Sequence, residues 1–513
     1  MRTHLFIVLS LLLITGAVYS RLAASNYCGF DDALELERMT FQDPGTLAAD
    51  MGTVLFNSFK YRPGMMTLNR LTYRLGDHSA AAFRIRNVVS HMLITATLYG
   101  VGMMLFDSIP VAAIGALLFG LNPLMNQAVA GAVWVIAPAN LCLIVSFFLF
   151  LLSLRAPRHN ILMLLGSMVI GSLGVLIYDP VIVLFGLIYL YLFVWIMVKR
   201  KTLPSAGYLA TLVGLTLLFL AVWFSLRARY LPHGAQHPVA FEAAARNFAI
   251  YAAAPFQFVD PLLANHILDT PLPPEALGGD ITGELLVVIL FPPLVFVCLI
   301  VYRLHALRKN LTRDDLANFI FLILAWGGSL LPYLAFNDHP SETYNYVGFL
   351  MMMLIFSRLF YAGFVQNGTI ASRGVYTAVI AMIVVLYVSA LVVKNDRVHA
   401  CGQTFARILA ALPAGKLHDG KWDIVFANVP GEPATRTYGM YGYKGIDTLG
   451  IGSYGAVGIE AALQFAFHNP EIKAESVDAH LLGATCNSHP PGQLCFWVHS
   501  EGEVEEAAPG ASR

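Results

Sequence analysis

The sequence predicts an all-α polytopic membrane protein. Hydrophobic residues make up 57% of the 513 residues and charged residues only 12%, a balance outside the range of ordinary soluble domains. Apolar runs of about 20 residues, the length needed to cross a bilayer, recur along the chain. Basic and acidic residues are equal in number, 32 each, which gives no basic face for a nucleic-acid partner.

About eleven apolar segments are predicted to cross the membrane. The first, Leu5–Val18, has the form of either a first membrane helix or a signal peptide. The others have the length and hydropathy of membrane helices. They lie near residues 88–106, 109–124, 128–154, 161–178, 180–198, 206–227, 284–303, 316–336, 343–363 and 374–394.

Positive charge is concentrated in alternate connections between these segments. Cytoplasmic loops of membrane proteins carry an excess of Lys and Arg, so the side that receives these connections is predicted to be cytoplasmic. The cations are Arg155, Arg158, Lys199, Arg200, Lys201, Arg303, Arg308, Lys309, Arg313 and Arg373. The exterior side then receives the large loops 21–87 and 228–283 and, after an odd number of crossings, the C-terminal region.

The chain divides into two predicted parts, a membrane module over residues 1–394 and a small soluble exterior domain over 395–513. In the second part Trp422–Ala427 and Leu494–Val498 alternate like strands, and Ala456–Phe467 has the period of a helix. A small α/β domain is therefore expected, with a disordered end over 501–513. Within loop 21–87, helical periodicity occurs around 33–39 and 65–75.

The cysteines on the predicted exterior side indicate an oxidising compartment. Cys486 and Cys495 bracket the turn-forming sequence Asn-Ser-His-Pro-Pro-Gly, so we predict a disulfide between them. A metal site that used these cysteines with His489 would lack a fourth ligand at a usual spacing. Cys142 and Cys298 lie within predicted spans, where packing is the expected role.

Two adjacent carboxylates, Asp31 and Asp32, follow the first apolar segment. At a membrane edge, low-dielectric surroundings would raise the basicity of a carboxylate, which could then accept a proton from an acceptor hydroxyl. The alternative is that the pair caps and begins a helix ahead of Leu34. An Asp-Asp pair can also ligate a divalent metal, and the sequence shows no requirement for any other cofactor.

A colinear series of motifs runs from the first large loop to residue 346. It consists of Arg62-Pro63, Asn69-Arg70, Tyr73, Leu75-Gly76, Phe83 to His91, Asn122-Pro123 with Gln127-Ala128-Val129, Ile177-Tyr178-Asp179-Pro180, Arg246 with Tyr251 and Pro255, and Ser341 to Tyr346. The series resembles the GT-C membrane glycosyltransferases related to protein O-mannosyltransferases, most closely the transmembrane, tetratricopeptide-repeat type. Thr343 stands where that family has Arg, Asn122 where it has His, and no repeat array follows.

The resemblance implies a GT-C type fold and transfer of a sugar from a polyprenyl-phosphate donor in the bilayer, on the exterior face. A phosphate leaving group needs cations or helix N-termini near it, and the candidates are Arg62, Arg84, Arg86 and Arg246. Each of these arginines could instead only snorkel to lipid headgroups. His91, inside a predicted span, either faces a cavity or is a hydrogen-bonded packing residue.

Three further candidates follow from the resemblance. Asp179 stands where the family has an acidic site, although its place before Pro180 also suits a helix cap. Glu342 and Tyr344 belong to the segment similar to the family's Glu-Arg-Tyr-x-Tyr motif.

The leading hypothesis is an inverting transferase in which Asp31 or Asp32 is the base. The sugar would be mannose or another hexose, and the acceptor a protein Ser or Thr, a lipopolysaccharide or another glycan. The location would be a bacterial inner membrane with the site facing the periplasm, or the endoplasmic reticulum with a lumenal site.

The rival hypothesis is a transporter or flippase for a lipid-linked sugar, but the repeated halves of such proteins do not occur here. A non-catalytic scaffold would leave the acid pair without a role.

Overall fold

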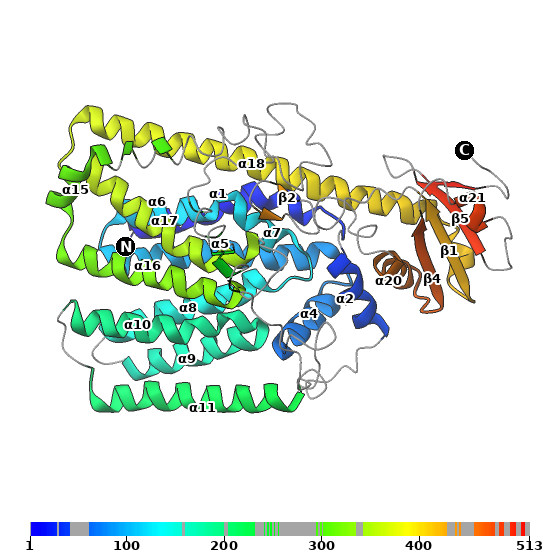
Figure 1. Ribbon diagram of the computed structural model, residues 1–513, viewed down its shortest axis with the longest axis horizontal. Helices are drawn as coiled ribbons and strands as arrows, with labels where there is room; N and C mark the ends of the chain where they lie inside the picture. The colour runs from blue at the N-terminus through cyan, green and yellow to red at the C-terminus, as the bar shows by residue number, and fades with distance from the viewer. Residues whose placement is uncertain are drawn as a thin grey trace.

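Long apolar helices make up most of the computed structural model (Figure 1). It describes residues 2–27, 30–41, 61–155, 160–199, 204–230, 301–334 and 342–427, with shorter pieces at 241–299 and 437–507. Within this part of the chain, eight helices are long and apolar enough to cross a membrane. They are α1 (Arg2–Ala23), α5 (Ala80–Phe106), α8 (Ile136–Arg155), α10 (Val183–Met197) with the preceding η3 (Asp179–Ile182), α11 (Ala206–Tyr230), α16 (Arg313–Leu334), α17 (Tyr346–Phe360) with the following η7 (Tyr361–Val365), and α18 (Ile370–Ala411).

A bent pair of helices and a shorter helix complete the set of apolar helices. The pair is α6 (Ile109–Gly120) with η2 (Pro123–Met125) and α7 (Asn126–Ala130), and the shorter helix is α9 (Asn160–Ile177). Every predicted span except 284–303 overlaps one of these helices, and most of 284–303 lies outside the described residues. The all-α polytopic membrane fold is confirmed.

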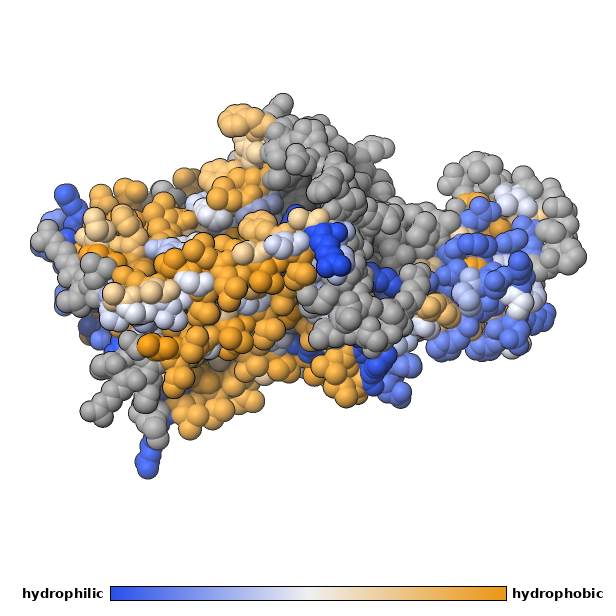
Figure 2. Space-filling model, turned by 90° about the horizontal axis from the view of Figure 1, so that it is seen from below, coloured by the Kyte–Doolittle hydropathy of each residue, from blue (hydrophilic) through white to orange (hydrophobic). Residues whose placement is uncertain are grey.

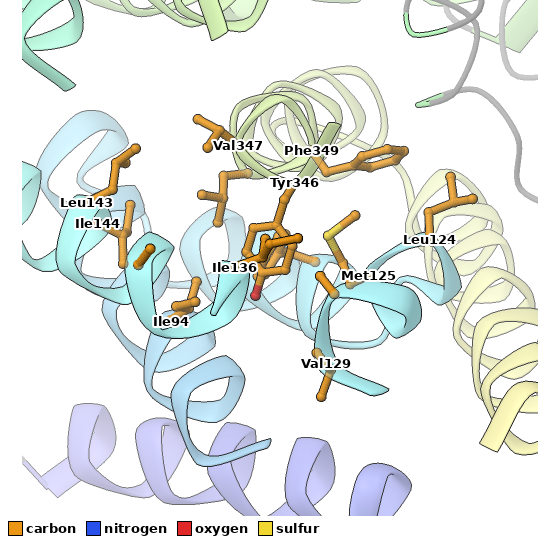
Figure 3. Close-up of a cluster of buried hydrophobic side chains, with 14 of the residues drawn as sticks. Ile94, Leu124, Met125, Val129, Ile136, Leu143, Ile144, Tyr346, Val347 and Phe349 are labelled. Carbon is orange, nitrogen blue, oxygen red and sulfur yellow. The ribbon is translucent and has the colours of Figure 1, made fainter. Parts of the chain in front are cut away.

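The helix α17 lies at the centre of the bundle, and nearly all of its residues are buried. Figure 3 shows its side chains among those of α5, η2, α7 and α8; the labelled residues are Ile94, Leu124, Met125, Val129, Ile136, Leu143, Ile144, Tyr346, Val347 and Phe349. The outer helices are different, because α9 and α11 expose large apolar side chains such as Leu162, Leu217 and Phe224. The bundle surface in Figure 2 is accordingly hydrophobic over a wide area, as expected for a surface in contact with lipid.

The chain between α6 and α8 departs from the predicted span 128–154, which begins too early. The pair α6 and η2–α7 is bent by 51°, and residues 131–135 that follow are not helical. Asn122 caps η2, since its side-chain oxygen accepts a hydrogen bond of 2.9 Å from the Leu124 N–H. This buried, partly extended backbone needs hydrogen-bond partners from elsewhere in the protein.

The helix α18 supplies some of these partners and also ties the bent segment to α1. Lys394, fully buried, donates to the Pro123 carbonyl at 3.1 Å. The next residue, Asn395, accepts a hydrogen bond from the Asn126 side chain at 2.7 Å and donates to the Val18 carbonyl at 2.8 Å. These polar residues suggest the end of a span, but α18 continues as a helix to Ala411.

The C-terminal part of α18 leads to a four-stranded sheet of order β4-β1-β5-β6 (Figure 1). The strand β1 (Trp422–Ala427) is parallel to β4 (Ile472–Val477) and β5 (Gln493–Val498), and β6 (Val504–Glu506) is antiparallel to β5. Two of these strands, β1 and β5, and the helix α20 (Ala456–Phe467) coincide with the sequence predictions. The strand β6 lies within the end that is predicted to be disordered.

A disulfide joins the end of α21 (Leu482–Cys486) to β5, through the predicted pair Cys486 and Cys495. The short elements α19 (Ala414–Leu417), β2 (Thr437–Tyr438) and β3 (Tyr441–Gly442) also belong to this region.

The two ends of the bundle carry different elements. Helices α2 (Phe30–Phe41) and α4 (Pro63–Leu75), both anticipated from periodicity within loop 21–87, lie at the end that faces the sheet. The helix α15 (Leu304–Asn310) lies at the other end, and the short η6 (Glu342–Asn345) precedes α17. We call these the sheet end and the opposite end.

Candidate active site

An ion pair between Arg62 and Asp179 joins two of the predicted site residues at the sheet end. Arg62 immediately precedes α4, and Asp179 begins η3 after the end of α9. The Arg62 Nε donates to Asp179 Oδ1 at 2.5 Å, and the guanidinium lies 4.3 Å from the centre of the Tyr178 ring. Burial, the largest single influence, acts to lower the pKa of Arg62, but the Asp179 carboxylate together with Tyr178 and Tyr333 acts in the other direction, and the pKa is raised.

A second arginine, Arg227, shares the same carboxylate. Its Nη1 lies 3.8 Å from Asp179 Oδ2, and its guanidinium lies 5.2 Å from the centre of the Trp223 ring, one turn earlier on α11. The side chain of Arg227 is 35% exposed, compared with 19% for Asp179 and 10% for Arg62. We call Arg62, Asp179 and Arg227 the open cluster, because its second cation is partly accessible.

Aromatic rings border the open cluster. The Tyr333 hydroxyl donates to the Tyr178 hydroxyl at 3.3 Å, and the Tyr333 ring stacks on Tyr344 with centroids 4.7 Å apart. The contact brings Tyr344, predicted as a site residue, into the neighbourhood of Arg62 and Asp179. A second stacked pair, Tyr61 and Tyr230, has centroids 5.9 Å apart and joins the residue before Arg62 to the end of α11.

The predicted phosphate ligands Arg84 and Arg86 have different surroundings. Arg84 is fully buried and donates to the backbone carbonyls of Ala130 and, at 2.8 Å, Asn26. Arg86 donates to the carbonyls of Ala132 at 3.1 Å and Trp134 at 3.0 Å. Both therefore satisfy the buried backbone around residues 130–135, and this geometry favours a structural role over binding of a phosphate.

Two asparagines act together with these arginines. Asn69 on α4 donates to the Val133 carbonyl at 3.0 Å and accepts from Arg86 at 2.7 Å, and Asn87 donates to the Gly131 carbonyl at 2.7 Å. The motif residues of α4 and α5 thus hold the non-helical segment between α7 and α8.

His91 is a buried, hydrogen-bonded residue of α5. Its Nε2 lies 3.0 Å from the Gly120 carbonyl, which only an N–H can satisfy, so Nδ1 is the acceptor for the Tyr346 hydroxyl at 2.6 Å. The ring also meets Tyr19 edge-on at 5.1 Å. Of the two roles predicted for His91, this geometry favours packing and fixation of the bend after α6.

The acid pair lies in the first turn of α2, and the Asp31 and Asp32 side chains are outside the described residues. Further along α2, Leu36 and Met39 pack in a small core with Tyr73, Phe83 and Val133. The Thr40 hydroxyl lies 2.9 Å from the Tyr73 hydroxyl of α4. The acid-pair helix is therefore held beside α4, the helix that Arg62 precedes.

The last two predicted site residues are Glu342 and Arg246. Glu342 begins η6, but its side chain lies outside the described residues, as does all of Arg246. Among the described residues no group of three or more His, Cys, Asp or Glu side chains could hold a metal ion.

Two residues of this site were missed at the sequence level. Arg227 is an arginine at the end of an apolar span, a position in which most arginines only reach lipid headgroups. Tyr333 lies in the last turn of α16 and has no motif of its own. Only the fold shows that both approach Asp179 and Tyr178.

The chain is similar to several solved structures. The archaeal oligosaccharyltransferase AglB from Archaeoglobus fulgidus, in complex with an inhibitory peptide and a dolichol-phosphate, is 12% identical, with a TM-score of 0.46 over 98% of this chain and 74% of that one. ArnT from Cupriavidus metallidurans is also 12% identical; its apo form has a TM-score of 0.47 over 96% of this chain and 92% of that one. The form bound to undecaprenyl phosphate has a TM-score of 0.46 over 96% and 93%.

No family model and no curated protein sequence matches the chain. These three similarities have TM-scores below 0.5, so the function of this chain is inferred from its own residues and geometry. Those features show a polytopic helical membrane protein with a small α/β C-terminal region and a cluster of two arginines around one carboxylate at the sheet end.

Proposed function

We propose that this protein is a GT-C type glycosyltransferase, which takes a sugar from a polyprenyl-phosphate donor and passes it to a hydroxyl group of a protein or glycan. The observation that carries the proposal is the open cluster, in which two arginines share one carboxylate at the end of a lipid-facing helix. The motif series that resembles the O-mannosyltransferases contributes Arg62 and Asp179 to this cluster.

The charges of the open cluster suit a lipid phosphate. Two guanidinium groups and one carboxylate have a formal sum of +1, so the cluster can accept an anion without leaving a buried negative charge unpaired. Arg227 is its most exposed member. The exposed apolar side chains of the same helix, among them Leu217, Leu218 and Phe224, would lie along the isoprenoid tail.

The reaction that fits these residues is a single displacement. The acceptor oxygen forms a bond to the anomeric carbon, its proton passes to Asp31 or Asp32, and the bond from the anomeric carbon to the phosphate oxygen breaks with both electrons going to the phosphate. Attack opposite the leaving group inverts the anomeric configuration. Arg62 and Arg227 would stabilise the charge that grows on the phosphate, and Asp179 would hold Arg62 in place. Tyr344, which is partly buried and stacks on the buried Tyr333, would offer its other ring face to a sugar.

Several finer features belong to the same proposal. The sugar is mannose or another hexose, and the reaction takes place on the exterior face, periplasmic in a bacterial inner membrane or lumenal in the endoplasmic reticulum. If the reaction uses a divalent metal, Asp31 and Asp32 would bind it, and chelation with EDTA would abolish turnover.

The test is a donor screen with purified protein. Radiolabelled polyprenyl-phosphate mannose, glucose, galactose and aminosugar are each incubated with peptide and glycan acceptors, and both the labelled acceptor and the free lipid phosphate are measured. We expect release of lipid phosphate with one donor, and turnover about 10²–10⁴-fold lower in Asp31→Asn or Asp32→Asn at equal amounts of folded protein. A flippase would move the intact donor across vesicles without releasing phosphate, and that result would overturn the proposal.

A further inference from the structure

The C-terminal region packs against the acid-pair helix through α20, and one aromatic side chain of α20 contacts rings on either side of that helix in the chain. Phe465, on α20, meets the Tyr27 ring edge-on with centroids 6.0 Å apart, and its centroid lies 6.5 Å from that of Tyr73. It also packs against the small core that contains Leu36 and Met39 of α2. An aromatic residue more than 400 positions along the chain from α2 thus packs, partly buried, against the core that holds α2.

The helix α2 depends on such contacts. It has 12 residues, a length at which an isolated helix is marginal in water. One side, with Leu36 and Met39, is packed against α4, α5 and residues 132–133. The helix α20 packs on α2 from the C-terminal region, as Figure 1 shows. Burial between two partners is therefore what keeps α2 in one position.

The chain just before α2 is fixed by the same two parts of the protein. The Asn26 carbonyl accepts from Arg84 at 2.8 Å, and the Tyr27 hydroxyl donates to the His78 carbonyl at 2.8 Å. On the other side, Gly402 of α18 approaches so closely that a Cβ there would lie 2.9 Å from the Asn26 backbone. The entry to α2 is thus held between the bundle and the extension of α18.

We propose that Phe465 is a positioning residue for the reaction. By packing on Tyr27 and Tyr73, it holds α2, and with it the acid pair in the first turn, at the orientation needed for proton transfer. The C-terminal region is then part of the active-site assembly. The inference rests on the proposed function, because it assigns a role in that same reaction.

The kinetic test is Phe465→Ala. A displacement of the base by about 1 Å can cost up to about 10²-fold in rate, so we expect kcat to fall by about tenfold or more. The KM for the polyprenyl-phosphate donor should stay near its normal value, because the open cluster is unchanged. Phe465→Leu, which keeps an apolar side chain of similar reach, should recover most of kcat. An equal loss in both variants, or a rise in KM with normal kcat, would contradict the inference.

A second measurement keeps the inference separate from the proposed function. Hydrogen exchange of the α2 amides needs no substrate, and Phe465→Ala should accelerate it while the amides of α5 and α17 exchange as in the unmodified protein. The matched control is Phe467→Ala on the same helix, since Phe467 is buried against His418. We expect this control, which leaves the Phe465 side chain and its contacts in place, to leave α2 protected.

The outcomes can be told apart. Unchanged exchange of α2 in Phe465→Ala, or equal acceleration in Phe467→Ala, would overturn the positioning role whatever the enzyme does. Accelerated exchange in Phe465→Ala alone, in a protein that releases no lipid phosphate from any donor, would leave Phe465 as the anchor of α2 and would contradict the proposed function instead.

Discussion

Two ion-pair clusters lie near opposite ends of the helical bundle and differ in how completely their charges are matched. At the opposite end, Asp315 receives two hydrogen bonds of 2.7 Å from Arg358, and both side chains are only 7% exposed. At the sheet end, the single carboxylate of Asp179 serves both Arg62 and Arg227. We call the pair of Asp315 and Arg358 the closed cluster.

The closed cluster has further partners that satisfy the hydrogen-bonding groups of both side chains. Arg358 also donates to Gln366 at 2.9 Å and to the Asn310 carbonyl at 3.3 Å, and Asp315 accepts from the Thr312 N–H and hydroxyl at 2.8 Å. It joins the start of α16 to the end of α17. An arginine in an ion-pair cluster therefore indicates a binding site only when the cluster keeps a surplus positive charge and one of its arginines is partly exposed, as Arg227 is.

The comparison requires that the two clusters face opposite sides of the membrane, and this is an all-or-none prediction. A topology reporter fused after Lys201 should lie in the cytoplasm, and one fused at Arg513 should lie outside it, because loops rich in Lys and Arg stay on the cytoplasmic side. If both reporters lay on the same side of the membrane, the predicted topology would be wrong.

Between the two clusters, the largest graded effect on turnover is expected at Arg62. Arg62→Met removes the cation that Asp179 holds, and loss of one preorganised donor to a developing anion typically lowers turnover by about 10²–10³-fold. Arg62→Lys keeps the charge but loses the planar fork, so its turnover should be intermediate. The measurement is lipid phosphate released per folded protein. Equal, near-normal turnover in the two variants would show that the open cluster does not contact the leaving group.

The closed cluster should affect stability and not chemistry. Removing one partner of a buried ion pair costs about 3–5 kcal/mol, so Arg358→Met should lower the free energy of unfolding by about that amount. The double variant with Asp315→Leu should recover part of the loss, because no unpaired charge remains. Turnover per folded protein should stay normal in both variants, and a specific loss of turnover would give this cluster a functional role as well.

The spans were predictable because hydropathy depends on composition, but the break at residues 131–135 was not. Ala130 to Val135 is apolar throughout, and its non-helical backbone is satisfied by hydrogen bonds that Asn69, Arg86 and Asn87 supply from distant positions. In the same way, Lys394 and Asn395 end an apolar run, yet α18 continues because both side chains find partners inside the protein. Local sequence does not report partners of this kind.

The site was predictable residue by residue, but its assembly was not. Arg62 and Asp179 are 117 positions apart and were selected for separate reasons. Arg84 and Arg86 were selected by the same reasoning as Arg62, and the fold surrounds them with carbonyl groups. The strand β4 was also missed, although buried Ile472 and Ala474 alternate with exposed Lys473 and Glu475 in the period of a half-buried strand.

The smallest effect, and the most direct test of the open cluster, is expected at Arg227. The measurement is equilibrium binding of a polyprenyl phosphate to purified protein, followed by the ³¹P resonance of the lipid, in Arg227→Ala and in the control Arg229→Ala. Arg229 lies on the same helix and contacts the Tyr230 ring. A hydrogen bond to a charged group is worth about 1.5–3 kcal/mol, so Arg227→Ala should bind about 10–100-fold more weakly, while Arg229→Ala should bind normally. Equal affinities in these two variants would contradict the claim that the open cluster holds the lipid phosphate.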